Sequence, residues 1–272
     1  MTMLKPIDLP RELAPGLFWL GGCQEQHYFG KVMHSTNSAF LISGTHSSML
    51  VEGGHPRDFV TLLDQLKTVL ARPDVAPLKY VFVTHQETPH STGMAQVMQR
   101  YPDVVTVGNM ADYHLVFPMF EDRLRWMKVG ERIDLGGRDF VAVEPVVRDL
   151  ATSLWGFDSG AGMLFPGDGF CFSHYHTDGH CGHLGEEATS IDIPETSAIF
   201  AEFALFWTKF CDMKPYIARL EQQVRELGVR AVGSTHGLPV MNLATCFEQI
   251  KTGLAYGSEK KEMGTPVGGR PM

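Results

Sequence analysis

The sequence predicts an α/β fold, and more closely a four-layer αββα sandwich built as one domain. Two observations predict it. Short β-like runs give way to helical segments in the first half of the chain, and the same order recurs in the second half. In addition, side chains with metal-ligand chemistry follow several of these runs, where α/β sheets usually place their sites. The chain has 272 residues, of which 44% are hydrophobic, so it can bury a sizeable core.

The first half of the chain alternates strands and helices. Apolar residues at helical spacing predict a helix over residues 57–70, and Pro73 lies just beyond its end. A second helix is expected over residues 91–101. Apolar runs bounded by glycine or polar residues predict strands at residues 16–20, 38–42, 48–51, 80–83 and 104–107.

The second half repeats this order. Its expected strands lie at residues 140–147, 153–157, 162–165 and 229–233. Residues 195–227 are expected to be mostly helical, with a break near Pro215, and a last helix is expected over residues 242–254. Residues 257–272 are rich in glycine, proline and lysine and show no periodicity. We therefore expect a domain over residues 1–256, followed by a C-terminal tail at the surface.

The composition argues against several classes of protein. A net charge of −8 argues against non-specific binding to nucleic acid or to anionic membranes. No run of about 18 apolar residues occurs, and the first residues carry no apolar segment typical of a secretory signal. The five cysteines are scattered and form no Cys-x-x-Cys pair, which fits a reducing compartment. A cytoplasmic protein without nucleic-acid or membrane partners is therefore expected.

The most informative stretch lies where the buried strand in the middle of the first half ends. Within six residues it delivers His85, Glu87 and His90, whose imidazole and carboxylate groups are typical ligands of zinc or non-haem iron. Two later strand ends supply Asp168 and His236. Because α/β sheets build sites at the carboxyl ends of their strands, these residues predict a metal site. The alternative is a polar loop whose side chains are solvated or cap the next helix.

The order of these strand-end ligands resembles the metallo-β-lactamase fold, and within it the flavodiiron proteins and their stand-alone oxygen-binding diiron relatives. The first motif of that family reads His-x-Glu-x-Asp-His. The segment His85-Gln-Glu87-Thr-Pro89-His90 keeps its two histidines and its glutamate. The resemblance covers nearly the whole chain.

The resemblance also implies a role for each ligand. One metal would be held by His85, Glu87 and Asp168, and the other by His90, Asp168 and His236, so that Asp168 bridges the pair. The expected cofactor is therefore one or two ions of iron or zinc. The flavodoxin domain of flavodiiron proteins does not follow in this sequence, so no flavin is expected to bind to this chain.

Two positions depart from the family's pattern. Pro89 replaces the aspartate of the motif and cannot bind a metal. Arg148 stands where the family's middle histidine is expected, and Asp149 beside it could act as the substitute ligand. The two could instead form an ion pair. In a further alternative, the Arg148 guanidinium is a fixed charge in the site, which replaces one metal or holds an anionic group of the substrate.

A segment dense in soft ligands follows Asp168. Residues 171–183 contain four histidines and two cysteines, at irregular spacing. They could form a separate metal site, supply replacement ligands, or be a polar, glycine-rich loop over the pocket. We expect His174 to lie nearest the pocket, and leave the roles of the other three histidines open: His176, His180 and His183. Earlier in the chain, Glu52 could hydrogen-bond a ligand histidine or belong to a turn.

Three functions are compatible with such a site. The preferred one is hydrolysis of a small organic substrate, because a metal lowers the pKa of bound water to about 7. Glu87 or Asp149 would then accept the proton, and Arg148 would hold the substrate. The alternative is a non-haem diiron oxidoreductase that binds or reduces oxygen or nitric oxide and draws electrons from a separate flavoprotein or rubredoxin. The third is a catalytically degenerate partner subunit, and in each case we expect a homo- or hetero-oligomer.

Overall fold

Two β-sheets form the centre of the structure, a computed structural model that describes residues 4–28 and 31–262. The first sheet has seven strands in the order β1-β2-β3-β4-β5-β6-β7, and the second has five in the order β12-β11-β10-β9-β8. The first sheet consists of β1 (Arg11–Ala14), β2 (Leu17–Tyr28), β3 (Lys31–Ser43), β4 (Ser48–Val51), β5 (Leu78–Val83), β6 (Val105–Gly108) and β7 (Leu124–Trp126). The second consists of β8 (Arg132–Asp134), β9 (Asp139–Val143), β10 (Trp155–Asp158), β11 (Met163–Phe165) and β12 (Ala231–Val232).

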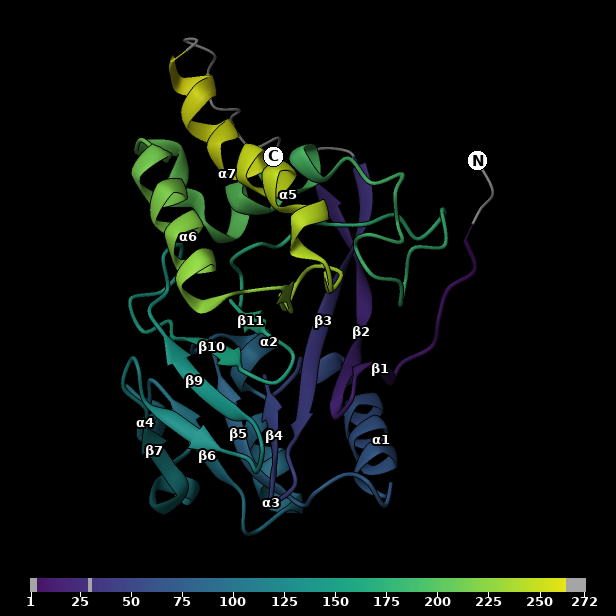
Figure 1. The fold of residues 1–272 in the computed structure, drawn as a ribbon, viewed down its shortest axis with the longest axis vertical. Helices are drawn as coiled ribbons and strands as arrows, with labels where there is room; N and C mark the ends of the chain where they lie inside the picture. Colours follow the sequence, from purple (N-terminus) through teal and green to yellow (C-terminus); the bar gives the residue numbers. More distant parts are fainter. Residues whose placement is uncertain (1–3, 29–30, 263–272) are drawn as a thin grey trace.

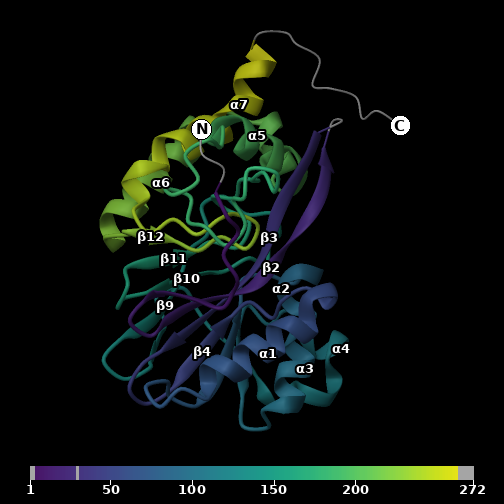
Figure 2. The ribbon, with the colours of Figure 1, turned by 90° about the vertical axis from the view of Figure 1, so that its right-hand side faces the viewer.

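Helices lie on both sides of the paired sheets. Figure 2 shows α1, α3 and α4 beside the first sheet and α5, α6 and α7 beyond the second. The α-helices are α1 (Phe59–Leu70), α2 (Thr88–Ser91), α3 (Met94–Arg100), α4 (Tyr113–Val116), α5 (Ile193–Ala204), α6 (Lys214–Leu227) and α7 (Phe247–Glu262). Short 3-10 turns are η1 (Pro56–Asp58), η2 (Pro118–Arg123), η3 (Phe206–Phe210) and η4 (Leu243–Thr245). The predicted α/β architecture with an αββα order of layers is confirmed.

Aromatic side chains join the two sheets. Phe82 of β5 contacts Phe140 of β9, with ring centroids 4.7 Å apart, and Phe40 of β3 contacts Phe165 of β11 at 5.2 Å. All four are almost completely buried, and burial of each such side chain contributes about 1.5–3 kcal/mol. A second apolar cluster fills the space between the first sheet and α1 and α3. The core therefore lies in two layers, one between the sheets and one beneath the helices.

The direction of the strands determines where a site can form. Strands β4, β5 and β6 run parallel to one another, and β11 runs parallel to β12. Their carboxyl ends are therefore the places where polar loops from different parts of the chain can meet. Next to them, β2 and β3 form an antiparallel hairpin paired from Leu17–Ile42 to Tyr28–Lys31, which extends along one side of the molecule (Figure 1).

Several element boundaries differ from the prediction. The break expected near Pro215 falls between α5 and α6, around η3. The last helix, expected to end at residue 254, continues to Glu262, so the start of the tail predicted at residue 257 is helical. Residues 263–272 lie outside the described part of the chain. Over the residues that the structure does describe, no helix combines the length and apolar character needed to cross a membrane.

Candidate metal centre

Four of the predicted ligands converge at the end of β5. His85 follows this strand. Glu87 directly precedes the short helix α2, and His90 lies within that helix. Asp168 reaches the same place from the loop after β11. One ligand atom of each residue lies within 4.8 Å of the ligand atoms of the other three. The parallel strand ends thus bring together the side chains that the sequence predicted.

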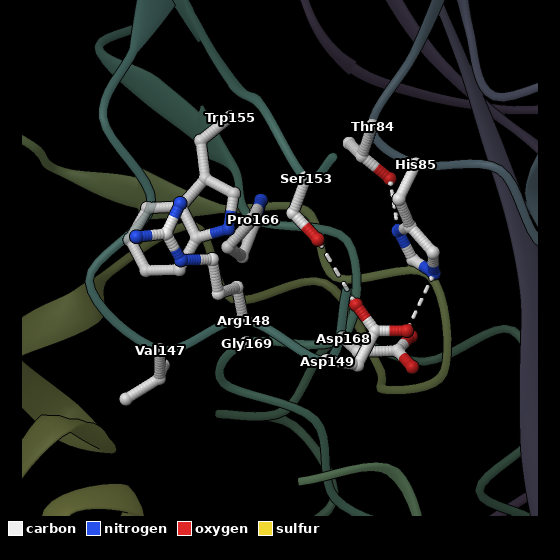
Figure 3. A pocket seen from close by; sticks show the side chains of 10 residues that line it. All are labelled: Thr84, His85, Val147, Arg148, Asp149, Ser153, Trp155, Pro166, Asp168 and Gly169. Carbon is white, nitrogen blue, oxygen red and sulfur yellow. Dashed lines mark hydrogen bonds and ion pairs between the residues drawn. The ribbon is translucent and has the colours of Figure 1, made fainter. Parts of the chain in front are cut away.

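His236 and Asp149 complete this group of six side chains, and we call the space between them the cleft. His236 comes from the loop after β12, and its Nε2 lies 3.6 Å from Oδ1 of Asp168. Asp149 comes from the connection between β9 and β10, and its Oδ2 lies 3.1 Å from Nε2 of His85. His85, Asp149 and Asp168 line the same pocket (Figure 3). All six predicted metal ligands therefore face one region.

A buried glutamate orients two of the histidines. Glu52, 2% exposed, accepts hydrogen bonds at Oε1 from Nδ1 of His90 at 3.1 Å and from Oγ1 of Thr84 at 2.5 Å. Oγ1 of Thr84 lies 3.0 Å from Nδ1 of His85 and can accept a hydrogen bond from it. Glu52 adopts φ 71°, a left-handed backbone conformation that costs free energy in a non-glycine residue. Glu52 therefore hydrogen-bonds a predicted ligand histidine and is not merely a turn residue.

His236 is oriented by the backbone of the long hairpin. Its Nδ1 donates a hydrogen bond to the carbonyl oxygen of Thr36, at 2.8 Å. The Nδ1 atoms of His85, His90 and His236 are thus all engaged by groups outside the cleft, which leaves each Nε2 directed inward. A fixed tautomer with a free Nε2 is the usual arrangement of metal-binding histidines.

Two buried atoms of the cleft lack partners. Nε2 of His90 and Oδ1 of Asp168 lie 3.3 Å apart, yet neither makes a hydrogen bond of acceptable geometry with any described residue. Buried polar atoms are rarely left unpaired in native proteins, so such atoms call for an explanation. A cation between them would satisfy both. The donor set of imidazoles and carboxylates fits iron or another borderline metal.

The charges of the cleft support the same interpretation. Burial disfavours the imidazolium of His90, but the carboxylates of Glu52 and Asp168 outweigh this and hold its pKa well above the usual value. Burial likewise disfavours the Asp168 carboxylate, but His236 and His90 outweigh it and lower the pKa of Asp168. The buried carboxylates therefore require positive charge beside them, either protons on the histidines or a metal.

Arg148 and Asp149 have different positions. The Arg148 side chain runs away from His85 and Asp149 (Figure 3), is 45% exposed, and reaches Glu144 at 3.9 Å. Asp149 faces His85 instead, so the predicted ion pair between Arg148 and Asp149 is not formed. The Arg148 guanidinium does not stand among the ligands as a fixed charge, but Arg148 lines the same pocket as His85 and Asp149, and its catalytic role stays a prediction.

The histidines of residues 171–183 lie elsewhere. His174 joins Cys181 and two residues of the long hairpin, Cys23 and His34, in a separate group that we call the Cys2His2 cluster. His174 is therefore not one of the cleft ligands, and among the described residues the segment supplies no replacement ligand there. His180 contacts Ser190, and His183 contacts Glu187. No pattern in the sequence singled out Cys23 and His34, which lie in the polar part of β2 and β3.

Comparison with known proteins places this geometry in context. No family model matches the chain. It is 22% identical to the coenzyme F420H2 oxidase of Methanothermobacter thermautotrophicus over 245 residues, which cover 83% of this chain and 56% of that protein. The chain thus spans little more than half the length of this relative. The rubredoxin oxygen:oxidoreductase from Desulfovibrio gigas superposes with a TM-score of 0.70 at 14% identity, over 92% of this chain and 61% of that chain.

A metallo-β-lactamase from Pontibacter korlensis also has a similar structure, with a TM-score of 0.57 at 12% identity over 90% of this chain and 98% of that chain. The chain therefore has the metallo-β-lactamase fold and resembles the flavodiiron proteins, as the sequence predicted. The preferred prediction of a hydrolase is wrong, because the relatives found by sequence include three coenzyme F420H2 oxidases, which are oxidoreductases. Zinc in the cleft has no support for the same reason.

Proposed function

We propose that this chain is the metal-binding unit of a non-haem diiron oxidoreductase that takes oxygen as its substrate and receives electrons from a separate donor. The names of two similar proteins, an F420H2 oxidase and a rubredoxin oxygen:oxidoreductase, support this reaction class. Because the chain spans only part of the relatives' length, its activity, its substrate and its electron donor all belong to the proposal. A cytoplasmic location and an oligomeric assembly are also part of the proposal.

The observation that carries the proposal is the position of Asp149. The sequence suggested that one metal had lost a ligand, because Arg148 stands where a histidine is expected. In the structure Oδ2 of Asp149 lies 3.1 Å from Nε2 of His85, and the side chain is only 12% exposed. Burial disfavours the Asp149 carboxylate, but His85 outweighs it and lowers the pKa of Asp149. A negatively charged oxygen beside His85 supports Asp149 as the substitute for the missing ligand.

The residues present fit a pair of irons. His85, Glu87 and Asp149 would hold one iron, and His90 and His236 the other, with Asp168 shared between them. Oδ1 of Asp168 and Nε2 of His90, the two unpartnered buried atoms, would both gain a partner. When bound, an iron pair supplies electron transfer to oxygen, chemistry that no amino-acid side chain in the cleft can perform.

The chain's own residues hold the ligand atoms in place, exclude water from one side of the cleft and leave the other side open to solvent. The histidines are fixed by Glu52, Thr84 and Thr36, so the ligand atoms are held before any metal arrives. His85 and His90 are almost completely buried, which excludes water from that side. The Glu87 side chain is 51% exposed and its Oε2 lies 3.5 Å from Nε2 of His85, so the cleft opens to solvent beside Glu87.

The proposal is tested by anaerobic reconstitution with Fe2+, followed by metal analysis and oxygen-electrode measurements with a chemically reduced flavoprotein or rubredoxin as donor. We expect two irons per chain and oxygen consumption that depends on both the iron and the donor. Asp149→Ala should lose iron and activity, whereas Glu144→Gln, a carboxylate on the same connection that is 53% exposed, should behave as wild type. Two bound irons without oxygen consumption would overturn the redox function, and no bound metal would favour a degenerate partner subunit.

A further inference from the structure

The second group of ligand side chains, the Cys2His2 cluster, lies outside the cleft and has no role in the proposed function. Cys23 belongs to β2 and His34 to β3, and the pairing of Cys23 with Thr36 places Cys23 and His34 on the same face of the hairpin. His174 and Cys181 come from the long loop between β11 and α5. Two chain segments far apart in sequence therefore contribute one thiol and one imidazole each.

The ligand atoms of the cluster lie close together. Sγ of Cys23 is 3.3 Å from Sγ of Cys181 and 3.3 Å from Nδ1 of His34. Sγ of Cys181 is 3.8 Å from Nδ1 of His34 and 3.5 Å from Nε2 of His174. All four ligand atoms lie within 4.8 Å of one another.

These separations match the edges of a tetrahedron around zinc. With Zn–S near 2.3 Å and Zn–N near 2.0–2.1 Å, tetrahedral angles give S–S edges of about 3.8 Å and S–N edges of about 3.6 Å. The observed S–N separations of 3.3, 3.5 and 3.8 Å surround that value, and the S–S separation of 3.3 Å is somewhat shorter. A cation at the centre would need only small shifts of the thiols.

The backbone holds two of the ligands in place without any metal. His34 and His174 form an antiparallel β-bridge, in which each amide nitrogen donates to the other's carbonyl oxygen, at 2.8 and 2.9 Å. His174 is completely buried. A buried imidazole that faces thiols gains little from such weak hydrogen-bonding partners, whereas thiolates and imidazoles together are the usual ligands of structural zinc.

We propose that Cys23, His34, His174 and Cys181 bind one structural zinc ion, which fastens the β2–β3 hairpin to the loop after Asp168. On binding, each of the two thiols releases a proton and the imidazoles stay neutral, so the site with Zn2+ carries no net charge. All four positions are then filled by protein, which leaves no open position for a substrate. The zinc would stabilise the fold and would take no part in oxygen chemistry.

The first test is zinc analysis of the full chain, purified under reducing conditions and incubated with Zn2+ while the cleft is loaded with Fe2+. Wild type should hold one zinc ion, and Cys23→Ser and Cys181→Ser should hold none. Matched controls are Cys211→Ser, a thiol outside the cluster, and His27→Ala, an imidazole on β2 whose side chain is 70% exposed. Both controls should keep the zinc, and His90→Ala in the cleft should keep it too, which separates this site from the proposed function.

A second test uses the wild type alone, so that a poorly folded variant cannot decide the question. Co2+ added in place of Zn2+ should give the strong thiolate-to-cobalt absorption of a tetrahedral site, and Zn2+ should slow the reaction of two thiols with a disulfide reagent. Equal thiol reactivity with and without Zn2+ would overturn the proposal. So would a Cys23–Cys181 disulfide in protein that has been exposed to Zn2+ under reducing conditions.

Discussion

The Glu52→Gln substitution tests whether one buried carboxylate orients the histidines of the cleft. Oε1 of Glu52 accepts hydrogen bonds from Thr84, His90 and Thr235, and Oε2 accepts one from the backbone of Thr84. Glutamine has nearly the same size, but it lacks the negative charge and turns an amide group toward these donors. Residue 52 is a non-glycine residue in both proteins, so its left-handed backbone should cost a similar free energy in each, and the comparison isolates the side-chain chemistry.

The expected loss follows from the contacts of Glu52. Removing a group that holds a metal-bound histidine lowers metal affinity about 10- to 100-fold, or about 1.4–2.7 kcal/mol. Glu52 holds His90 directly and His85 through Thr84, so two ligands lose their orientation at once. We therefore expect the upper end of the range, a loss of about 100-fold.

Competition with a chromophoric chelator for Fe2+, under anaerobic conditions, measures the effect. Glu144→Gln serves as the control, because that carboxylate is 53% exposed and contacts only the exposed Arg148 among the described ion pairs. Thermal unfolding of the metal-free proteins shows whether Glu52→Gln is folded. A folded Glu52→Gln protein that binds Fe2+ as tightly as wild type would refute the reasoning.

Three further predictions follow from the same structure. Pro89→Asp restores the carboxylate of the family's motif and should tighten iron binding about tenfold relative to Pro89→Ala, or about 1.4 kcal/mol; equal affinities would place residue 89 away from the metal. Asp158→Asn breaks a two-bond pair with Arg138, whose side chains are 0% and 8% exposed, and should lower the free energy of unfolding in urea by about 3–5 kcal/mol. Asp139→Asn, from the exposed pair with Arg132, should cost less than about 1 kcal/mol, and similar losses in the two proteins would contradict this view. Removal of metal with a chelator should lower the unfolding temperature, because a ligand at 100 times its Kd adds about 2.7 kcal/mol of stability; identical melting curves would show that no metal is bound to the native state.

The ligands at strand ends were accessible to prediction because they follow from sheet geometry. A buried apolar run followed at once by His85, Glu87 and His90 fixes those side chains to the carboxyl end of one strand. Asp168 and His236 follow other strands of the same kind, and parallel pairing brings such ends together. Periodicity and strand ends thus sufficed to predict both the layers and most of the cleft.

Other features depend on contacts that leave no local pattern. Whether Arg148 or Asp149 faces His85 is decided by the path of an irregular connection, which periodicity cannot describe. The strands β2 and β3 extend far beyond the apolar runs at residues 16–20 and 38–42. These outer halves were not predicted because they are largely polar and pair mainly with each other. The Cys2His2 cluster was therefore not predictable, since two of its members lie in that polar part of the hairpin.

The pairing of β2 with β3 affects both the cleft and the Cys2His2 cluster. In β3, the ring of His34 belongs to the Cys2His2 cluster, and the carbonyl oxygen of Thr36, two residues later, positions His236 in the cleft. Shifting a strand by one residue moves every side chain to the opposite face. Insertion of a single residue between His34 and Thr36 would therefore disturb the cleft and the cluster together, which predicts that length changes in this strand are tolerated far less than changes of side chain.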